Sequence, residues 1–160
     1  MDHGKCVAIA SLDLSKAFDA INHEMLLDKL TKLGLSESAL IWIRSYLSKR
    51  TQCTRFSDYT SKEEEITAGV PQGSILGPLL FICFSNDIYN SLEDKCTAFS
   101  YADDSQLIVT GKNQKELIKK IEEVISIAHS WYSKNCMKAN QGKTEILILN
   151  KGNQNTQKKN

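Results

Sequence analysis

The chain has 160 residues, of which 41% are hydrophobic and 24% are charged, and this composition is ordinary for a soluble globular protein. Twenty basic and nineteen acidic residues leave a net charge of +1, which excludes a global field that would attract a polyanion. Any nucleic-acid binding would then depend on local geometry or on segments outside this chain. The length allows one domain with a real core and does not comfortably allow two.

The cysteines and the apolar runs bear on the compartment. The five cysteines are scattered, none lie at CxxC spacing, and no histidine is close enough to suggest zinc. This pattern favours reduced, mostly buried thiols in an intracellular protein. No signal peptide opens the chain, and the longest apolar run, near Leu79–Phe84, is too short to span a bilayer. We therefore expect an intracellular chain that is not secreted and has no membrane partner.

The chain begins with a strand followed by a helix. Lys5–Leu14 is typical of a buried strand and delivers Asp13 near its carboxyl end. The apolar residues from Ile21 to Leu33 follow the spacing of an amphipathic helix, and Asn22 or Asp19 is its expected N-cap.

A second helix and a hairpin come next. Ser36–Lys49 predicts a helix with Ser36 as its cap. Thr51–Tyr59 and Glu65–Val70 have strand-like composition, and we expect them to form a hairpin around a turn at Thr60–Glu64. Gly69–Ser74 predicts a loop, because two glycines and a proline in so short a span disfavour both helix and strand.

The middle of the chain predicts an apolar helix and a second hairpin. Ile75–Leu92 is apolar throughout, and Pro78 is tolerable only in the first turn of such a helix. Phe99–Val109 outlines a hairpin with Asp103 and Asp104 at its turn.

The last third predicts the clearest helix, a strand and a tail. Asn113–Asn135 carries one apolar stripe, widened by Ile118, Ile125 and Tyr132; the stripe consists of Leu117, Ile121, Val124, Ala128 and Trp131. Glu145–Leu149 predicts a final strand, and 151–160 is polar enough to be a disordered tail. The order indicates an α+β fold with a ferredoxin-like βαββαβ antiparallel sheet, helices on one face, and a helical and hairpin insertion after the first strand.

In such a core the first strand and the central hairpin lie side by side, so Asp13 and the Asp103–Asp104 turn are expected to meet. Carboxylates from separate segments can hold two Mg²⁺ ions roughly 3.5–4 Å apart and support an in-line phosphoryl or nucleotidyl transfer. The alternative is that these acids are solvated residues at strand ends and in a surface turn. Spacing alone leaves both readings open.

Three motifs follow one another in order along the chain. They are Asp13–Asp19 with Asn22-His23, Gly69–Pro78, and Tyr101–Asp104. Together they resemble the successive palm motifs of reverse transcriptases, most closely those of non-LTR (LINE-type) retrotransposons. The resemblance reaches to about Asn150 and implies a polymerase palm over residues 1–150.

The resemblance implies the metal ligands and an acid catalyst. Asp13 and Asp103 would be the principal ligands, with Asp104 the third acid and the backbone carbonyl of Leu14 a further oxygen ligand. Lys143 resembles the lysine that protonates the departing pyrophosphate, although a lone exposed lysine is more often a solvated charge.

The resemblance also implies the nucleotide contacts. Phe18 matches the bulky residue that packs against the sugar, or is a core aromatic. Gln72 and Gly73 match the loop that contacts the incoming nucleotide and the template. Tyr101 would lie on the primer side of the acids, or is a half-buried strand tyrosine; Asp19 matches a motif acid, or caps a helix.

The implied activity is that of an RNA-directed DNA polymerase with two Mg²⁺ ions, for which Mn²⁺ is a substitute, acting on an RNA template with a DNA primer and a dNTP. Fingers and thumb segments of a longer polyprotein are expected to be largely missing, so the fragment would be weakly active or inactive alone. The near-zero net charge agrees, since the grip on a duplex rests on basic contacts. The alternatives are a non-enzymatic retroelement remnant and a maturase-like RNA-binding module. The family implies a nuclear or cytoplasmic location.

Overall fold

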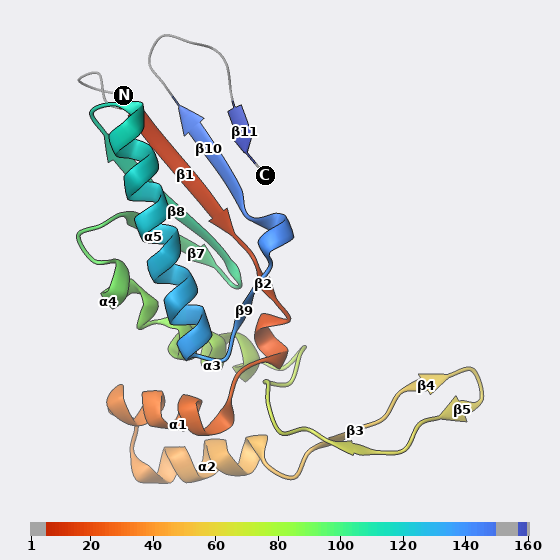
Figure 1. Cartoon of the computed structure of the whole chain (residues 1–160). Coiled ribbons are helices and arrows are strands. Elements are labelled where there is room, and N and C mark those ends of the chain that lie inside the picture. Colours follow the sequence, from red (N-terminus) through yellow and green to blue (C-terminus); the bar gives the residue numbers. More distant parts are fainter. Residues whose placement is uncertain (1–5, 150–156, 160) are drawn as a thin grey trace. The chain divides into compact units, whose positions relative to one another are not determined.

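The computed structural model describes residues 6–149 and 157–159 (Figure 1). The chain divides into two compact units. The sheet unit comprises Met1–Ala17 and Ser85–Asn160, and the helical unit comprises Phe18–Phe84. The mixed helix-and-sheet architecture expected from the sequence is confirmed. No helix within the described ranges is long and apolar enough to cross a membrane.

The sheet unit is built around strand β1 (Cys6–Leu12). The sheet has five strands in the order β11-β10-β1-β8-β7, and every neighbouring pair is antiparallel. The other strands are β7 (Thr97–Tyr101), β8 (Asp104–Gly111), β10 (Glu145–Leu149) and β11 (Gln157–Lys159). The predicted first strand, central hairpin and final strand are therefore confirmed.

Strand β11 falls within the segment 151–160, where the polar composition predicts a disordered tail. Residues 157–159 instead pair with β10, with Lys159 opposite Ile146, so the prediction is wrong for these three residues. The remaining residues of that segment lie outside the described part of the chain. Pairing at a sheet edge uses backbone groups alone, and polar composition therefore does not exclude it.

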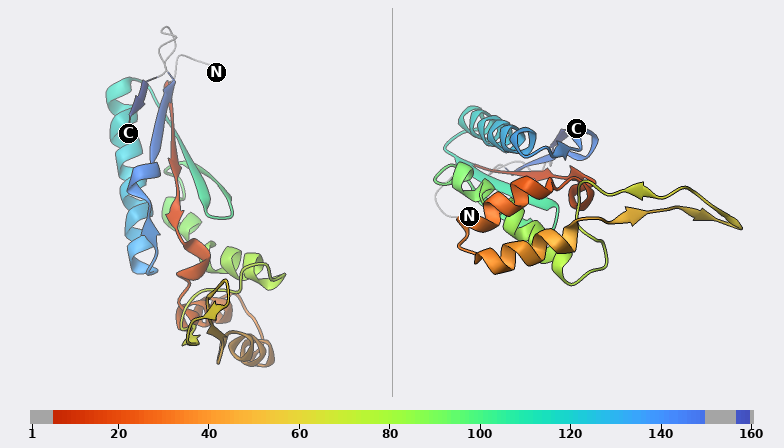
Figure 2. Two further views of the ribbon diagram at one scale, coloured as in Figure 1. Left: turned by 90° about the vertical axis from the view of Figure 1, so that its right-hand side faces the viewer. Right: turned by 90° about the horizontal axis from the view of Figure 1, so that it is seen from below.

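Helix α5 (Gln114–Lys134) runs along one face of the sheet, as the left-hand view of Figure 2 shows. All five residues of its predicted stripe are buried. They meet the small and branched residues of the central strands, of which Ala8, Ala10, Leu107 and Val109 are buried. Alanine on β1 lets the helix approach closely. A Cβ on Gly111 would lie 3.0 Å from the backbone nitrogen of Leu117, so a larger residue there would press on the first turn of α5.

The predicted single helix Ile75–Leu92 is wrong in extent, because the chain forms two helices there. They are α3 (Leu76–Ser85) and α4 (Ile88–Leu92), and α4 packs beside α5 in the sheet unit. Asn and Asp at the break are poor helix formers. Asp87 also accepts a hydrogen bond from Trp131 Nε1 of α5 at 3.1 Å, which holds the start of α4. Pro78 lies in the first turn of α3, as predicted.

After α5 the chain returns to the end of β1. Strand β2 (Leu14–Ser15) pairs with β9 (Lys138–Ala139) in a separate two-stranded ladder. The short 3₁₀ helix η2 (Gln141–Lys143) then leads into β10. This ladder holds the segment after α5 directly beside Asp13.

The helical unit begins with the 3₁₀ turn η1 (Ala17–Asp19), which starts at the unit boundary, and contains α1 (His23–Lys32) and α2 (Glu37–Leu47). The Asn22 side chain accepts from Met25 N at 3.0 Å and Ser36 caps α2, so Asn22 is the α1 cap and the alternative of Asp19 is wrong. The largest buried side chains of this unit are Ile21, Leu26, Leu30, Leu47, Phe81 and Phe84.

The predicted hairpin of the helical unit is present with a different turn. β3 (Thr51–Gln52) pairs with β6 (Glu64–Glu65), and β4 (Arg55–Phe56) pairs with β5 (Tyr59–Thr60). The turn is therefore at Ser57-Asp58 and not at Thr60–Glu64. Ser57 has φ of +53°, and Ser and Asp are common turn residues. The hairpin residues are exposed on both sides, so burial does not fix their register from the sequence.

Candidate active site

The pairing of β1 with β8 brings Asp13 and Asp104 together. Leu12 lies opposite Ser105 and Ser11 opposite Gln106. One step further in this register, Asp13 reaches the level of Asp104. Side chains alternate along a strand, and Leu12 is buried towards α5, so Asp13 faces the opposite side of the sheet. The same alternation places Asp104 on that side.

Asp13 and Asp104 line one pocket of about 570 Å³ within the sheet unit. Asp13, between β1 and β2, and Asp104, at the start of β8, thus share one space, as expected from the sequence. The other lining residues are Ser11, Leu12, Ser105, Gln106, Gly142, Lys143 and Glu145.

Lys143 shares this pocket with the acids. Its Nζ lies 3.4 Å from Asp13 Oδ2, while its side chain stays 67% exposed and that of Asp13 is 20% exposed. The ammonium is therefore positioned at the carboxylate and is not solely a solvated charge. Exposure keeps it accessible to a group that enters the pocket.

Asn140 and Glu145 are two residues of this site that the sequence reasoning misses. The side-chain Nδ2 of Asn140 donates to Asp13 Oδ2 at 3.1 Å, and its backbone nitrogen donates to Asp13 O at 2.9 Å. Glu145 lies opposite Ser11 at the start of β10 and lines the pocket. The available signal for Asn140 is its place at the start of the motif that carries Lys143; Glu145 requires the strand register.

Asp103 occupies the turn of the β7–β8 hairpin. Tyr101 pairs with Asp104, which leaves Ala102 and Asp103 as a two-residue turn with Ala102 at φ +52°. Asp103 is half-buried and is not among the described residues that line the pocket. Tyr101 is 85% exposed, so the alternative of a half-buried strand tyrosine is wrong. Leu14 is buried in the β2–β9 ladder directly after Asp13.

The donor set of the pocket suits a hard cation. Among the residues that the structure describes, no group of three or more His, Cys, Asp or Glu side chains is close enough to hold a metal ion. Mg²⁺ commonly takes one or two protein carboxylates and completes its shell with water and phosphate oxygens. Three carboxylates line the pocket, those of Asp13, Asp104 and Glu145. One or two of them would meet that requirement, whereas the described acids do not form a closed all-protein cage.

The remaining predicted residues lie in the helical unit, where two motifs meet. Gln72 Nε2 donates to Asp19 Oδ1 at 2.7 Å, and Val70 N donates to Phe18 O at 2.9 Å. The Phe18 ring lies 4.6 Å from that of Phe81, centroid to centroid. Gly73 has φ of +75°, a backbone conformation that favours glycine, and nothing lies within 4 Å of where a Cβ would stand.

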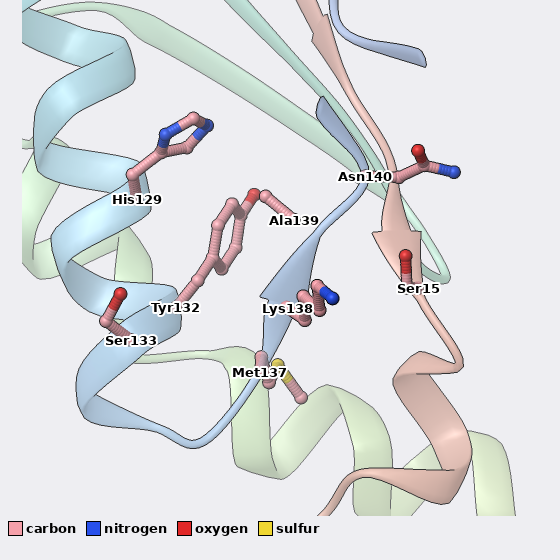
Figure 3. Close-up of a pocket in the computed structure, with 8 residues that line it drawn as sticks. All are labelled: Ser15, His129, Tyr132, Ser133, Met137, Lys138, Ala139 and Asn140. Carbon is pink, nitrogen blue, oxygen red and sulfur yellow. The ribbon is translucent and has the colours of Figure 1, made fainter. Parts of the chain in front are cut away.

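A second pocket of about 450 Å³ lies in the sheet unit between α5 and the β2–β9 ladder (Figure 3). His129 and Tyr132 extend from α5 towards this space. The buried atoms His129 Nε2 and Tyr132 Oη have no hydrogen-bond partner among the described residues. Burial raises the pKa of Tyr132 to about 12, so its hydroxyl stays protonated at physiological pH.

The chain matches a known protein family over nearly its whole length. The family model described as "Reverse transcriptase (RNA-dependent DNA polymerase)" matches residues 1–159. The chain belongs to the reverse transcriptase family. Members of this family generally use divalent metal ions.

Curated relatives agree with this assignment. A putative 115 kDa protein in type-1 retrotransposable element R1DM of Drosophila melanogaster is 33% identical over 140 residues, which cover 86% of this chain and 13% of that protein. The RNA-directed DNA polymerase from mobile element jockey of the same organism is 30% identical over 137 residues, which cover 82% of this chain and 15% of that protein. The resemblance to non-LTR reverse transcriptases is confirmed, and the chain spans about one seventh of these relatives.

The fold of this reverse transcriptase family member also matches a solved structure. Apo telomerase from Candida tropicalis, truncated from its C-terminal domain, aligns with a TM-score of 0.66 at 16% identity. The alignment covers 96% of this chain and 36% of the telomerase chain. At this identity the likeness concerns the fold alone.

Proposed function

We propose that the chain carries the nucleotidyl-transfer site of an RNA-directed DNA polymerase, with the sheet unit as the polymerase palm. The observation that carries this proposal is the pocket shared by Asp13 and Asp104 in a chain of the reverse transcriptase family. The strand order β10-β1-β8-β7 supports a ferredoxin-like βαββαβ palm, with the helical unit as the insertion after its first strand.

In this proposal Asp13, Asp103 and Asp104 would hold two Mg²⁺ ions, or Mn²⁺ as a substitute, and the Leu14 carbonyl would add an oxygen ligand. When bound, the two ions would supply charge stabilisation for the entering and leaving oxygens of an in-line transfer. The acids themselves neutralise and orient, because little covalent chemistry falls to the protein in such reactions. The hard oxygens of Asp13 and Asp104 on one pocket support this assignment.

Lys143 is the proposed proton donor to the departing pyrophosphate. Its ammonium lies 3.4 Å from Asp13 Oδ2 and remains mostly exposed, which supports a role at the same site. In the helical unit, Gln72 and Gly73 would contact the incoming nucleotide and the template, and Phe18 would pack against the sugar. Tyr101 would lie beside the primer.

The proposed partners are an RNA template with a DNA primer, a dNTP, and segments of a longer polyprotein that supply the fingers and thumb. The share of 13–15% that the chain covers in its relatives supports the last of these. The proposed setting is intracellular, nuclear or cytoplasmic. Without those segments the chain would extend a primer weakly or not at all.

The test is a Mn²⁺ titration of the chain in which electron paramagnetic resonance measures the concentration of free Mn²⁺. We expect saturable binding that weakens about tenfold or more in Asp13→Asn and Asp104→Asn. Asp94→Asn is the matched control, because Asp94 is exposed and lies at φ +61°, a conformation that asparagine tolerates.

Equal Mn²⁺ affinity in all four proteins would refute the proposed site. Adding an RNA template, a DNA primer and a dNTP to the same samples then separates the alternatives. RNA binding without metal binding indicates a maturase-like module. A chain that melts cooperatively but binds neither RNA nor metal indicates a non-enzymatic remnant.

A further inference from the structure

We propose that Asn140 is a positioning residue that fixes the orientation of the Asp13 carboxylate in the pocket. This inference rests on the proposed function, since it concerns how the chain presents Asp13 to a divalent cation. It does not require that Asn140 itself touch the metal or the substrate.

Asn140 holds Asp13 at two points. The backbone nitrogen of Asn140 donates to Asp13 O at 2.9 Å, and the side-chain Nδ2 donates to Asp13 Oδ2 at 3.1 Å. The first bond fixes the backbone of Asp13 at the start of the β2–β9 ladder, and the second fixes the rotation of its carboxylate. Together they restrict the rotation of the Asp13 side chain, which is 20% exposed.

Capping does not explain the asparagine at this position. Asparagine is a favoured N-cap because its side-chain oxygen accepts from the first backbone amides of the helix. Asn22 and Asn113 do this, accepting from Met25 N at 3.0 Å and from Glu116 N at 2.9 Å. Asn140 is the N-cap of η2, yet its side chain makes no cap hydrogen bond. Its amide is directed at Asp13 instead.

Asn140 also holds the turn that carries Lys143. The carbonyl oxygen of Asn140 accepts from Lys143 N at 3.0 Å. Asn140 also lines the second pocket, although in Figure 3 its side chain points away from His129 and Tyr132 of α5. One residue therefore links the backbone of Lys143 to the carboxylate of Asp13.

The two side-chain contacts of Asp13 share one oxygen. Asn140 Nδ2 and Lys143 Nζ both approach Oδ2, and no group in the described part of the chain forms a hydrogen bond to Oδ1. Holding Oδ2 in this way would leave Oδ1 available to a cation. Residues that orient a metal ligand from behind commonly change metal affinity 10–100-fold when mutated.

The experiment compares Mn²⁺ affinity of the wild-type chain with Asn140→Ala and Asn113→Ala. Asn140→Ala removes only the side-chain bond and keeps the backbone bond to Asp13 O. We expect its Mn²⁺ affinity to fall about tenfold. Asn113→Ala removes a true cap at the start of α5, so it should lower the melting temperature and leave Mn²⁺ affinity unchanged.

A second measurement covers the case in which Asn140→Ala fails to fold. The NMR signal of the Asn140 side-chain NH₂ group is measured in ¹⁵N-labelled wild type, Asp13→Asn and Asp94→Asn. Relative to wild type, its chemical shift should change in Asp13→Asn and should stay the same in Asp94→Asn. An Asn140 chemical shift that is the same in wild type and in Asp13→Asn overturns the proposal.

The outcomes also distinguish this proposal from the one on which it rests. Wild-type affinity in a folded Asn140→Ala chain overturns the positioning role alone. Absence of saturable Mn²⁺ binding in the wild-type chain overturns the proposed function, and the positioning role with it.

Discussion

Tyr132 makes the stability of the sheet unit depend on alkaline pH. Its side chain is 3% exposed, and its hydroxyl has no hydrogen-bond partner among the described residues. Burial raises its pKa to about 12; the neighbouring Ser105 hydroxyl offsets part of this shift, and Tyr89 adds to it. The ordinary pKa of tyrosine in an unfolded chain is about 10.

The sign follows from proton binding. Between about pH 10 and pH 12 the folded chain keeps the Tyr132 proton while the unfolded chain loses it. The stabilisation is therefore fully present below pH 10 and is lost as the pH rises towards 12. A difference of about two pKa units corresponds to roughly 2–3 kcal/mol of unfolding free energy.

The assay is urea unfolding at pH 8 and at pH 11.5, with wild type, Tyr132→Phe and Tyr101→Phe. The exposed Tyr101 is the matched control, and each variant is compared with wild type at the same pH so that other titrating groups cancel. Between these pH values the unfolding free energy of wild type should fall by about 2 kcal/mol more than that of Tyr132→Phe. At pH 8, Tyr132→Phe should be as stable as wild type or more stable, because it removes a buried hydroxyl without a partner.

Two results would refute this reasoning. An identical loss of stability with pH in wild type and Tyr132→Phe would show that Tyr132 does not titrate differently in the folded state. A cost above about 1 kcal/mol for Tyr132→Phe at pH 8 would show that the hydroxyl makes a favourable hydrogen bond.

Packing and backbone geometry supply further predictions. Ile121→Ala should lower the free energy of unfolding by about 2–5 kcal/mol, because Ile121 lies on the buried stripe of α5 and is 2% exposed. The adjacent exposed Glu122→Ala should change stability by less than about 0.5 kcal/mol in the same urea assay. Gly69→Ala should lower the melting temperature more than Gly34→Ala, although both glycines have φ near +88°. A Cβ at Gly69 would lie 2.8 Å from Asp19 Cα, whereas nothing lies within 4 Å at Gly34; equal melting temperatures would contradict the clash.

Local pattern was sufficient for the long elements. The stripe of Asn113–Asn135 predicts α5 to within a residue at each end, because caps and apolar spacing agree there. Composition failed where a short polar interruption decides the structure. Asn86-Asp87 divides an apolar run into two helices, and Ser57-Asp58 forms a turn inside a strand-like run. In both cases two residues outweigh a longer pattern.

The candidate site could be predicted only in part, because its two kinds of residue depend on different information. Asp13 and Asp104 are visible in the sequence as acids at the ends of predicted strands. Glu145 becomes part of the pocket only through its pairing with Ser11 across the sheet. That register has no local signature, since a slip of one residue would turn every side chain of β10 to the other face.

Asn140 illustrates a further limit, which concerns what a side chain does once its position is known. The sequence places an asparagine before a short turn, and its usual role there is to cap. The structure shows a capping position with the amide committed to an acid 127 residues earlier in the chain. Of the three asparagine N-caps in the described part of the chain, only Asn140 makes no capping hydrogen bond with its side chain and instead contacts a distant residue. If Asn140→Ala lowers the Mn²⁺ affinity and Asn113→Ala does not, then a residue at a capping position that makes no capping hydrogen bond can be used as a sign of a positioning residue.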